Sequence, residues 1–425
     1  MLPLAPAEPF GHMRGMDENL LQEVVAKARA AGADAAEAVF AERQSLSVTV
    51  RLGALEEVER EESRDLGVRV FVGRRQATVS GSDITPEGRS RLIERAVAMA
   101  KLAPEDPYAG LAPEDRLARG PMPDLQLYDA SEPDAEALEA MALQAENAAR
   151  GTPGVTNSDS SSASWSIGAW RLVTSTGFFG EHRASSFGIG ADAGRRAVAR
   201  LGSRKIASTT APVIFENRIA AQALGPLLGA ISGPSVARGV SFLKNKLGER
   251  VFAERVTITD EPHRPRGLGS APFDDEGVAN RTANIVDAGV LTTWLLNSAS
   301  ARQLGLETTG HASRGLAGPP GVSPSNLTVQ PGELDQAALM REAGEGLLVT
   351  TLFGPSLNPN TGDWSVGCAG FWFENGEIAY PVNEITVAGN LIEAYGRITP
   401  GSDLEFRGSA NSPSLLIEQL AIAGK

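Results

Sequence analysis

The chain has 425 residues, of which 42% are hydrophobic and 21% are charged, and these values are typical of folded globular proteins rather than disordered chains. At about 150 residues per domain, this length predicts two or three domains. The 39 basic and 52 acidic residues give a net charge of −13, which argues against direct binding of nucleic acid or anionic membrane and favours basic peptides. The single cysteine, Cys368, excludes an intrachain disulfide and a cysteine-based metal cluster.

The first sixteen residues, MLPLAPAEPFGHMRGM, lack a basic segment followed by a continuous apolar run. They are therefore predicted to form a disordered tail rather than a secretory signal. The uncharged window at residues 219–237 consists mostly of Ala, Gly, Ser and Pro, so it is too weakly apolar for a membrane span. We expect a cytoplasmic protein without a membrane-spanning segment.

Helix and strand patterns alternate at the start of the chain. Apolar residues recur at helical spacing over residues 20–28, and Gly32 follows as a stop signal, so a helix is predicted there. Residues 46–50 and 68–72 alternate between apolar and polar side chains, which predicts two strands.

Two further helices are predicted before residue 154. The first begins at Pro86 with Thr85 as its cap, and the second runs from residues 131–133 to Gly151. Between them, residues 103–124 are rich in Pro, Asp and Gly and are interpreted as a linker or surface meander. The inward face of the last helix is predicted to carry Leu138, Met141, Ala145 and Ala148.

Strands and hairpins dominate the pattern after Gly154. Hairpins are predicted at residues 285–294 and 371–380, the second around the Asn-Gly pair that is the strongest short hairpin signal. Loops are predicted at residues 315–324 and 354–362. The fold class is therefore α+β, with a mixed N-terminal α/β domain at residues 17–210 and a mainly antiparallel β domain at residues 211–425.

The four histidines do not form a local zinc-peptidase motif. Such a motif needs two histidines on one helical face and a glutamate that deprotonates the bound water, and no histidine here is followed by Glu. We interpret each as a surface or loop residue. The sequence also lacks a G-x-S-x-G elbow and a P-loop, although a Ser–His–Asp triad from distant positions remains open. The histidines are His12, His182, His263 and His311.

Other local patterns have an ordinary structural interpretation beside a functional one. Cys368 lies among small residues and is interpreted as buried and inert, with a nucleophile as the alternative. Residues 188–193 match G-x-G-x-x-A, but the preceding strand signal is weak and the next acid is late, so a glycine turn into a helix is favoured over a dinucleotide loop. The aromatic residues at 371–373, with Trp294 and Trp364, are interpreted as β-core rather than a peptide-binding wall.

Charged clusters are treated in the same way. Residues 274–277 (Asp-Asp-Glu-Gly) are predicted to form an acidic turn, with a divalent-cation site as the alternative. Residues 260–263 (Asp-Glu-Pro-His) are interpreted as a strand end followed by a turn. A local basic run is interpreted as a solvated helix face; it contains Arg195, Arg196, Arg200, Arg204 and Lys205.

Four long runs resemble the TldD/PmbA family, and within it the PmbA branch, also called TldE. They are GVSFLKNKLGERVF (239–252), GLGSAPFDDEGV (267–278), GVLTTWLLNSASARQLGLETTGHA (289–312) and TGDWSVGCAGFWFENGEIAYPVNEITVAGNL (361–391). The resemblance extends from about Asp17 to Lys425. It implies a cytosolic two-subunit metallopeptidase in which a TldD-like subunit carries a His-Glu-x-x-x-His motif and a cysteine ligand, and the PmbA-like subunit lacks the metal site.

The resemblance also implies which positions have lost the metal ligands. Residues 213–220 match the metal motif, with Phe215 and Ala220 where the histidines would stand, while Glu216 keeps the glutamate of the motif. Ser412 stands near the expected cysteine. No catalytic residue, metal ligand or cofactor is assigned to this chain, zinc is expected only in the TldD-like partner, and the peptide-binding residues stay unassigned. Residues 187–210 are shorter than the family pattern leads us to expect.

Three hypotheses about function follow. The leading one is a non-catalytic subunit that forms a heterodimer with a TldD-like catalytic subunit and processes unfolded peptides, as in the family roles of peptide-antibiotic maturation and antitoxin turnover. The second is a peptide-binding or regulatory homodimer acting alone, in line with the family's older label as a modulator of DNA gyrase. The third is an independent hydrolase that uses a dispersed triad or the acids of residues 274–276.

Overall fold

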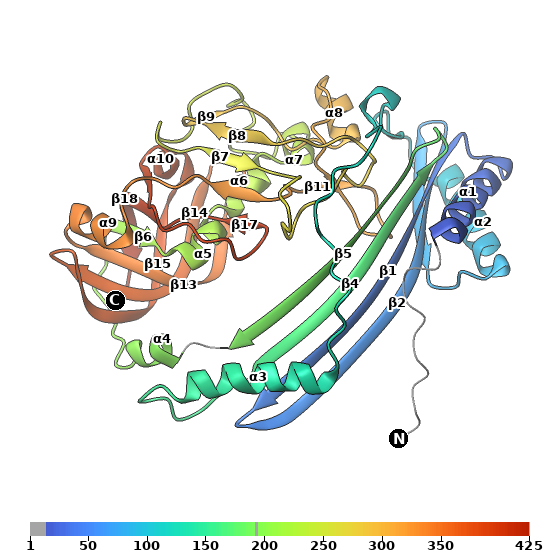
Figure 1. Ribbon diagram of the computed structural model, residues 1–425. Helices are drawn as coiled ribbons and strands as arrows, with labels where there is room; N and C mark the ends of the chain where they lie inside the picture. Colours follow the sequence, from blue (N-terminus) through green and yellow to red (C-terminus); the bar gives the residue numbers. More distant parts are fainter. Residues whose placement is uncertain (1–13, 192–193, 425) are drawn as a thin grey trace.

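The computed structural model describes residues 14–191 and 194–424. Its first sheet has five antiparallel strands in the order β3-β2-β1-β4-β5, which Figure 1 shows as a long curved layer. The two strands predicted at residues 46–50 and 68–72 lie within β1 and β2, which are much longer than predicted. The strands are β1 (Ala35–Arg51), β2 (Ala54–Val72), β3 (Arg75–Gly81), β4 (Ser161–Thr174) and β5 (Phe179–Ala191).

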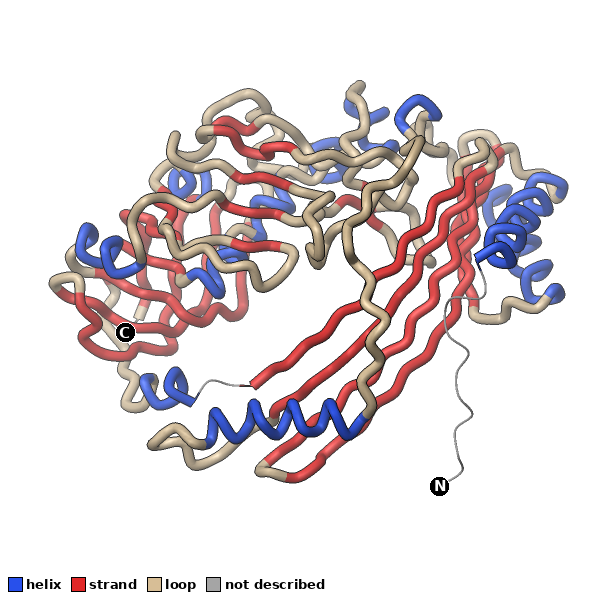
Figure 2. The backbone as a smooth tube through the Cα atoms, viewed as in Figure 1, coloured by secondary structure: helices blue, strands red, loops and turns tan. Residues whose placement is uncertain are grey.

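Three helices cover one face of this sheet. Helices α1 (Arg14–Ala30) and α2 (Pro86–Leu102) pack on one end through a buried apolar cluster, and α3 (Ala135–Arg150) lies across the other end (Figures 1 and 2). The predicted start of α2 is confirmed, because the hydroxyl of Thr85 accepts a hydrogen bond of 3.1 Å from the amide of Gly88. The predicted 1–16 tail lies outside the described residues up to residue 13, and residues 14–16 belong to α1.

The predicted inward face of α3 is wrong in part. Leu138 is buried, but Met141 and Ala148 are exposed, and the buried stripe continues through Ala142 and Glu146. The reason is polar: both carboxylate oxygens of Glu146 accept hydrogen bonds of 2.7 Å from the backbone amides of the β1–β2 turn, Leu52 and Gly53. A buried carboxylate with two such donors replaces an apolar side chain at this position.

The segment predicted as a linker, residues 103–124, is irregular apart from the short 3-10 helix η2 (Glu114–Arg116). It packs on the C-terminal half of the chain rather than lying free. The amide of Ala118 donates to the carbonyl of Gly277 at 2.8 Å, and Arg302 donates to the carbonyl of Tyr108 at 2.8 Å.

A small closed barrel forms the core of the C-terminal half. Its strands follow the order β15-β14-β13-β6-β18-β16, and a further β15–β18 pairing closes the sheet on itself. The predicted hairpin at residues 371–380 is confirmed, with Asn375 and Gly376 both at positive φ in the turn. The strands are β6 (Thr209–Phe215), β13 (Gly346–Leu357), β14 (Asp363–Glu374), β15 (Glu377–Asn390), β16 (Ile398–Pro400) and β18 (Leu415–Ala423).

One predicted loop in this barrel is partly strand. Residues 354–357 extend β13 instead of forming a loop, and the pairing register shifts between Phe353 and Ser356. This irregularity accommodates Gly354, whose φ is +58°, and Pro355, which cannot donate to a ladder. The loop begins only after Leu357.

A second sheet, in the order β17-β12-β7-β8-β9, packs beside the barrel, and the predicted hairpin at residues 285–294 is its β8–β9 unit, turning at Gly289. The predicted loop at residues 315–324 contains only the short strand β11 (Gly321–Val322), which pairs with β10 (Ala312–Ser313). The other strands are β7 (Ile258–Asp260), β8 (Ala283–Asp287), β9 (Val290–Leu291), β12 (Leu327–Val329) and β17 (Ala410–Asn411).

Short helices connect these sheets, and the chain as a whole has the predicted α+β fold. The uncharged window at residues 219–237 forms three of these helices, and none of the described helices is long and apolar enough to cross a membrane. The helices are α4 (Gly194–Ala199), α5 (Asn217–Ala223), α6 (Gly225–Ala230), α7 (Gly233–Ala237), α8 (Ser298–Leu304), α9 (Gln336–Ala343) and α10 (Leu391–Tyr395).

Candidate functional site

The segment that resembles a metal motif forms the junction between strand β6 and helix α5. Phe215 is the last residue of β6, pairs with Val349 of β13, and is fully buried with its ring centroid 6.3 Å from that of Trp364. Ala220 is also fully buried, in the apolar core of the barrel. Both side chains are therefore part of the core and offer no lone pair to a ligand.

Glu216 caps this junction and is held by a neighbouring cation. Arg218 donates from Nε to the Glu216 carboxylate at 2.9 Å and makes a second, shorter bond to its other oxygen. About a fifth of each side chain is exposed. The carboxylate is thus neutralised by a two-point contact with a guanidinium, the strongest geometry for such a pair.

The structure brings this junction close to the C-terminal segment. The side-chain nitrogen of Asn217 donates to the backbone carbonyl of Asp403 at 2.7 Å, and Arg407 donates to the Asn217 side-chain oxygen at 3.1 Å. Ser412, at the position expected for a cysteine, is buried and donates to the carbonyl of Pro413 at 2.8 Å. Its hydroxyl is therefore occupied by a backbone acceptor.

The donor set at this junction does not fit zinc. Zinc sites in proteins use imidazole nitrogens, thiolates and carboxylates, whereas this junction supplies a phenyl ring, a methyl group and one carboxylate bound to Arg218. Elsewhere in the described residues, no group of three or more His, Cys, Asp or Glu side chains is arranged to hold a metal ion.

The histidines are held in separate places. The Nε2 atom of His263 lies 2.7 Å from the side-chain oxygen of Asn280. His311 is buried, with Nδ1 2.8 Å from the Thr309 hydroxyl and Nε2 3.3 Å from the Asp260 carboxylate. His182 departs from the predicted surface or loop setting because it lies within β5, where burial lowers its pKa to about 4. His12 lies outside the described residues.

The acidic segment at residues 274–277 forms the predicted turn. The amide of Gly277, at φ +81°, donates to the carbonyl of Asp274 at 2.8 Å. The Asp274 carboxylate accepts hydrogen bonds from the amides of Glu276, Val278 and Ala312 at 2.9–3.0 Å. Burial and the nearby charge of Glu276 raise its pKa well above the usual range. This carboxylate therefore stabilises a turn.

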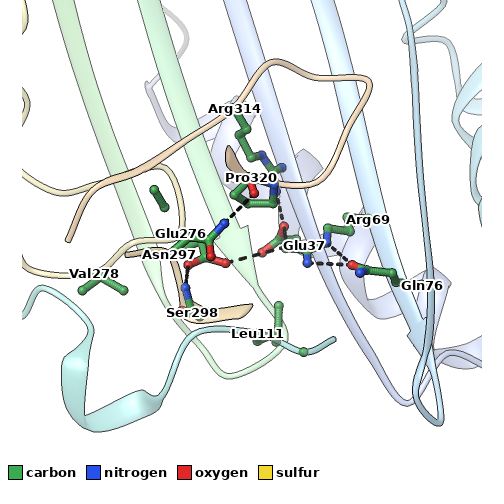
Figure 3. A network of polar contacts seen from close by, with 12 residues as sticks. Glu37, Arg69, Gln76, Leu111, Glu276, Val278, Asn297, Ser298, Arg314 and Pro320 are labelled. Atoms are coloured by element: carbon green, nitrogen blue, oxygen red, sulfur yellow. Dashed lines mark hydrogen bonds and ion pairs between the residues drawn. The ribbon is translucent and has the colours of Figure 1, made fainter. Parts of the chain in front are cut away.

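Glu276 belongs to a buried ionic network that joins the two halves of the chain (Figure 3). Glu37 of β1 accepts a hydrogen bond from Arg69 of β2 at 3.2 Å and a shorter one from Arg314 of the C-terminal half. Glu276 lies 4.0 Å from Arg69 and accepts from the amide of Ser298 at 2.8 Å. All four charged side chains of the network are almost completely buried, so their charges are balanced within the protein.

The network was not predicted because its members are distant in the sequence. Glu37 and Arg314 are separated by 277 positions, and no local pattern marks either residue as buried.

The prediction for residues 260–263 is confirmed. Strand β7 ends at Asp260, and a turn follows.

The remaining sequence patterns resolve as structural features. Cys368 is fully buried in β14, where burial raises the pKa of its thiol to about 12, so the interpretation as an inert residue is confirmed. The predicted aromatic core is also confirmed: Trp294, Trp364, Trp372 and Phe373 are buried.

Two local interpretations were wrong. Residues 188–191 are the end of strand β5 rather than a glycine turn, and they pair with residues 161–164 of β4. The basic run is not one helix face, because only Arg195 and Arg196 lie in α4. Arg200 instead donates to the hydroxyl of Thr351 at 2.6 Å. Arg204 stacks over Tyr380 at 3.3 Å, and Lys205 forms an ion pair with Glu384 at 2.7 Å.

A cleft of about 1100 Å³ lies between the first sheet and the loops that face it. Ser166, Gly168 and Ser186 are among the small residues from β4 and β5 that line it, together with His182 and Trp170. Its other walls are residues 124–129, which we call the strap, and the loop at residues 266–270. Sequence reasoning missed this cleft because its walls come from segments spread between residues 41 and 270.

Comparison with known proteins identifies the family. Models of the PmbA/TldA metallopeptidases match the chain in three parts: domain 1 at residues 36–100, the central domain at residues 128–224 and the C-terminal domain at residues 208–424. The chain therefore belongs to the PmbA/TldA metallopeptidase family.

Within this family, the chain is similar to the PmbA branch over nearly its whole length. It is 36% identical over 445 residues to the metalloprotease PmbA of Escherichia coli O157:H7, covering 96% of both chains. It is 34% identical over 453 residues to the PmbA homologue of Haemophilus influenzae, covering 97% of this chain and 98% of that protein.

Two solved structures share the fold. A Bacteroides thetaiotaomicron protein, named as a candidate modulator of DNA gyrase, superposes with a TM-score of 0.87 at 25% identity, covering 97% of this chain and 100% of that one. TldE from Thermococcus kodakarensis superposes with a TM-score of 0.84 at 21% identity, covering 95% of this chain and 100% of that one.

Proposed function

We propose that this chain is the non-catalytic subunit of a cytoplasmic, two-subunit peptide-processing metalloprotease, and that it acts as a heterodimer with a TldD-like subunit that carries the zinc. The observation that supports the proposal is the β6–α5 junction. Phe215 and Ala220 are buried core residues there, and the one carboxylate, Glu216, is bound to Arg218. A glutamate without a metal has no polarised water to deprotonate, so its presence does not make this junction catalytic.

The physical role of the chain would be to hold unfolded peptide near the partner's active site. The cleft of about 1100 Å³ has room for several residues of an extended chain, and the small side chains on its floor leave that room open. The net charge of −13 favours basic or neutral segments over nucleic acid.

A second candidate is a peptide-binding or regulatory homodimer that acts without a catalytic partner. It is favoured by the similarity to the Bacteroides protein named as a candidate modulator of DNA gyrase. The two candidates differ in what they require: the first needs a zinc-bearing partner for any proteolysis, and the second needs none.

The direct test of the junction is the zinc content of the purified chain. After dialysis against micromolar zinc and removal of free metal, we expect no stoichiometric zinc, and Glu216→Gln should give the same result as the unchanged chain. One zinc per chain, lost in Glu216→Gln, would show that the junction does bind metal, and the non-catalytic proposal would then have to be abandoned.

A further inference from the structure

Two long strands of the first sheet have a free edge. Strand β3 pairs with β2 only from Leu66 onward, so the edge of residues 54–65 has no neighbour on that side among the described strands. Strand β5 is the last strand on the opposite side. A free edge presents unpaired backbone groups to any extended chain, and proteins usually protect it with charged side chains.

The two edges are protected very differently. Residues 54–65 of β2 read ALEEVEREESRD and carry eight charged side chains. Residues 184–191 of β5 read ASSFGIGA and contain no charged residue and no proline. By the usual rules of edge protection, the β2 edge is closed to strand pairing and the β5 edge is open to it.

The orientation of the open edge follows from one hydrogen bond. The amide of Ser185 donates to the carbonyl of Leu127 in the strap at 2.9 Å, so residue 185 directs its backbone groups away from β4. The β4–β5 register continues without a shift to Ala191. Because backbone groups alternate in direction along an antiparallel strand, the amides and carbonyls of Phe187 and Ile189 also point outward. They have no hydrogen-bond partner among the described residues.

An apolar pocket lies beside this edge. A cavity of about 650 Å³ between α3 and β5 is lined by Leu138 and Met141 of the helix and by Phe187 and Ile189 of the strand. Phe187 is 53% exposed, Ile189 61% and Met141 43%. A contiguous apolar surface of this kind on an otherwise charged protein marks a binding site.

We propose that an extended peptide adds to β5 as a sixth strand, with its backbone hydrogen-bonded to Phe187 and Ile189 and one apolar side chain in the α3–β5 pocket. The strap supports this occupant because its Leu127 carbonyl already accepts a hydrogen bond from the Ser185 amide, immediately before the free part of the edge, so another backbone can pair with this side of β5. Glu132 at the pocket and the net charge of −13 favour a neutral or basic peptide over an acidic one.

The inference rests on the proposed function, since it assigns the unfolded peptide a place on this subunit. In strand addition, main-chain hydrogen bonds give most of the affinity and the pocket selects the side chain. The acceptor edge lies in a different part of the fold from the β6–α5 junction, because it belongs to the first sheet rather than to the barrel.

The test measures binding of a fluorescein-labelled Thr-Val-Leu-Val-Thr-Lys peptide to the isolated full-length chain by fluorescence anisotropy. Two further probes have the same sequence with N-methyl groups on alternate backbone nitrogens, one probe for each of the two alternating sets. Because a methylated nitrogen cannot donate a hydrogen bond, we expect at least one of these two probes to bind about tenfold more weakly. Equal binding of the unmethylated peptide and both methylated probes would overturn the inference.

Variants of the chain supply the matched comparison. Ile189→Pro removes an outward amide without touching a β4 hydrogen bond, and Ile189→Ala keeps that amide while shortening the side chain. We expect about tenfold weaker binding for Ile189→Pro and a smaller loss for Ile189→Ala. Circular dichroism checks that both variants fold. Unchanged binding to a folded Ile189→Pro would also refute the site.

Two further outcomes distinguish failure of this peptide site from failure of the proposed function. If the chain dimerises through this edge, sedimentation will show a dimer that Ile189→Pro abolishes and no peptide binding, and a second copy will then be the occupant instead. Because the binding assay contains no catalytic partner, its failure leaves the zinc test of the proposed function unaffected.

Discussion

Replacing Arg69 by methionine tests how strongly the buried ionic network holds the two halves of the chain together. Arg69 contacts Glu37 at 3.2 Å, Gln76 at 2.7 Å and Glu276 at 4.0 Å, and only 1% of its side chain is exposed. Methionine has a similar length but no charge. The substitution leaves Glu276 without its nearest cation and Gln76 without its donor.

Removing one partner of a buried ion pair typically destabilises a protein by about 3–5 kcal/mol, because a charge remains buried without compensation. For a domain of 150–250 residues, each kcal/mol lowers the melting temperature by about 2–4 °C, so we expect Arg69→Met to lower it by ~6–20 °C. Circular dichroism at pH 7 measures this shift.

The matched control is Arg64→Met on the same strand. Arg64 also forms an ion pair, 3.1 Å from Glu42, but 56% of its side chain is exposed. Glu42 itself is buried, but without Arg64 it keeps a hydrogen bond of 2.8 Å from Arg171. The exposed guanidinium of Arg64 is therefore expected to contribute about 0–1 kcal/mol, and the melting temperature of Arg64→Met should fall by no more than ~4 °C. Equal shifts in the two variants would refute the argument that burial, rather than pairing itself, makes Arg69 essential.

Three smaller predictions concern titration. Burial raises the pKa of Asp275 from 3.8 to about 6, so the free energy of unfolding falls as pH rises through this range. In urea unfolding, Asp275→Asn should therefore become more stable relative to the unchanged chain between pH 4 and 6, and the difference should then stay constant. Burial lowers the pKa of His182 from 6.5 to about 4, so the stability that the neutral imidazole contributes is lost as pH falls through that range. His182→Gln should therefore make the free energy of unfolding depend less on pH between 6.5 and 4. Burial raises the pKa of the Cys368 thiol to about 12, so Ellman's reagent should not react with the native chain but should titrate one thiol in urea; reaction in the native state would place this cysteine at the surface.

Local signals in the sequence were sufficient for elements whose conformation is set by neighbouring residues. The Asn375-Gly376 turn and the Thr85 cap were predicted because each depends on a few adjacent side chains. The same applies to the acidic turn before Gly277, whose carboxylate bonds are mostly to its own backbone.

Features set by tertiary contacts could not be predicted in this way. Glu146 occupies the buried stripe of α3 because the β1–β2 turn supplies two amides to it, and nothing in the helix itself indicates those donors. The exposed part of β2 remains a strand because β1 pairs with it, although its own residues are mostly charged. The ionic network around Glu37 and Arg314 depends on contacts across 277 positions.

The candidate site likewise has some features that the sequence shows and others that only the fold shows. The absence of a local histidine motif is visible in the sequence, and so are the apolar residues Phe215 and Ala220 at the positions implied by the family resemblance. The cleft and the open edge of β5 required the fold, because both depend on which strands are neighbours and which strand is last.

The most direct test of the central claim is hydrolysis of casein by the purified chain, by its TldD-like partner and by the two mixed, each with and without a zinc chelator. We expect full activity only in the mixture, abolished by the chelator and unchanged when this chain carries Glu216→Gln. Hydrolysis by this chain alone would contradict the account, because it would require a catalytic site within the chain itself.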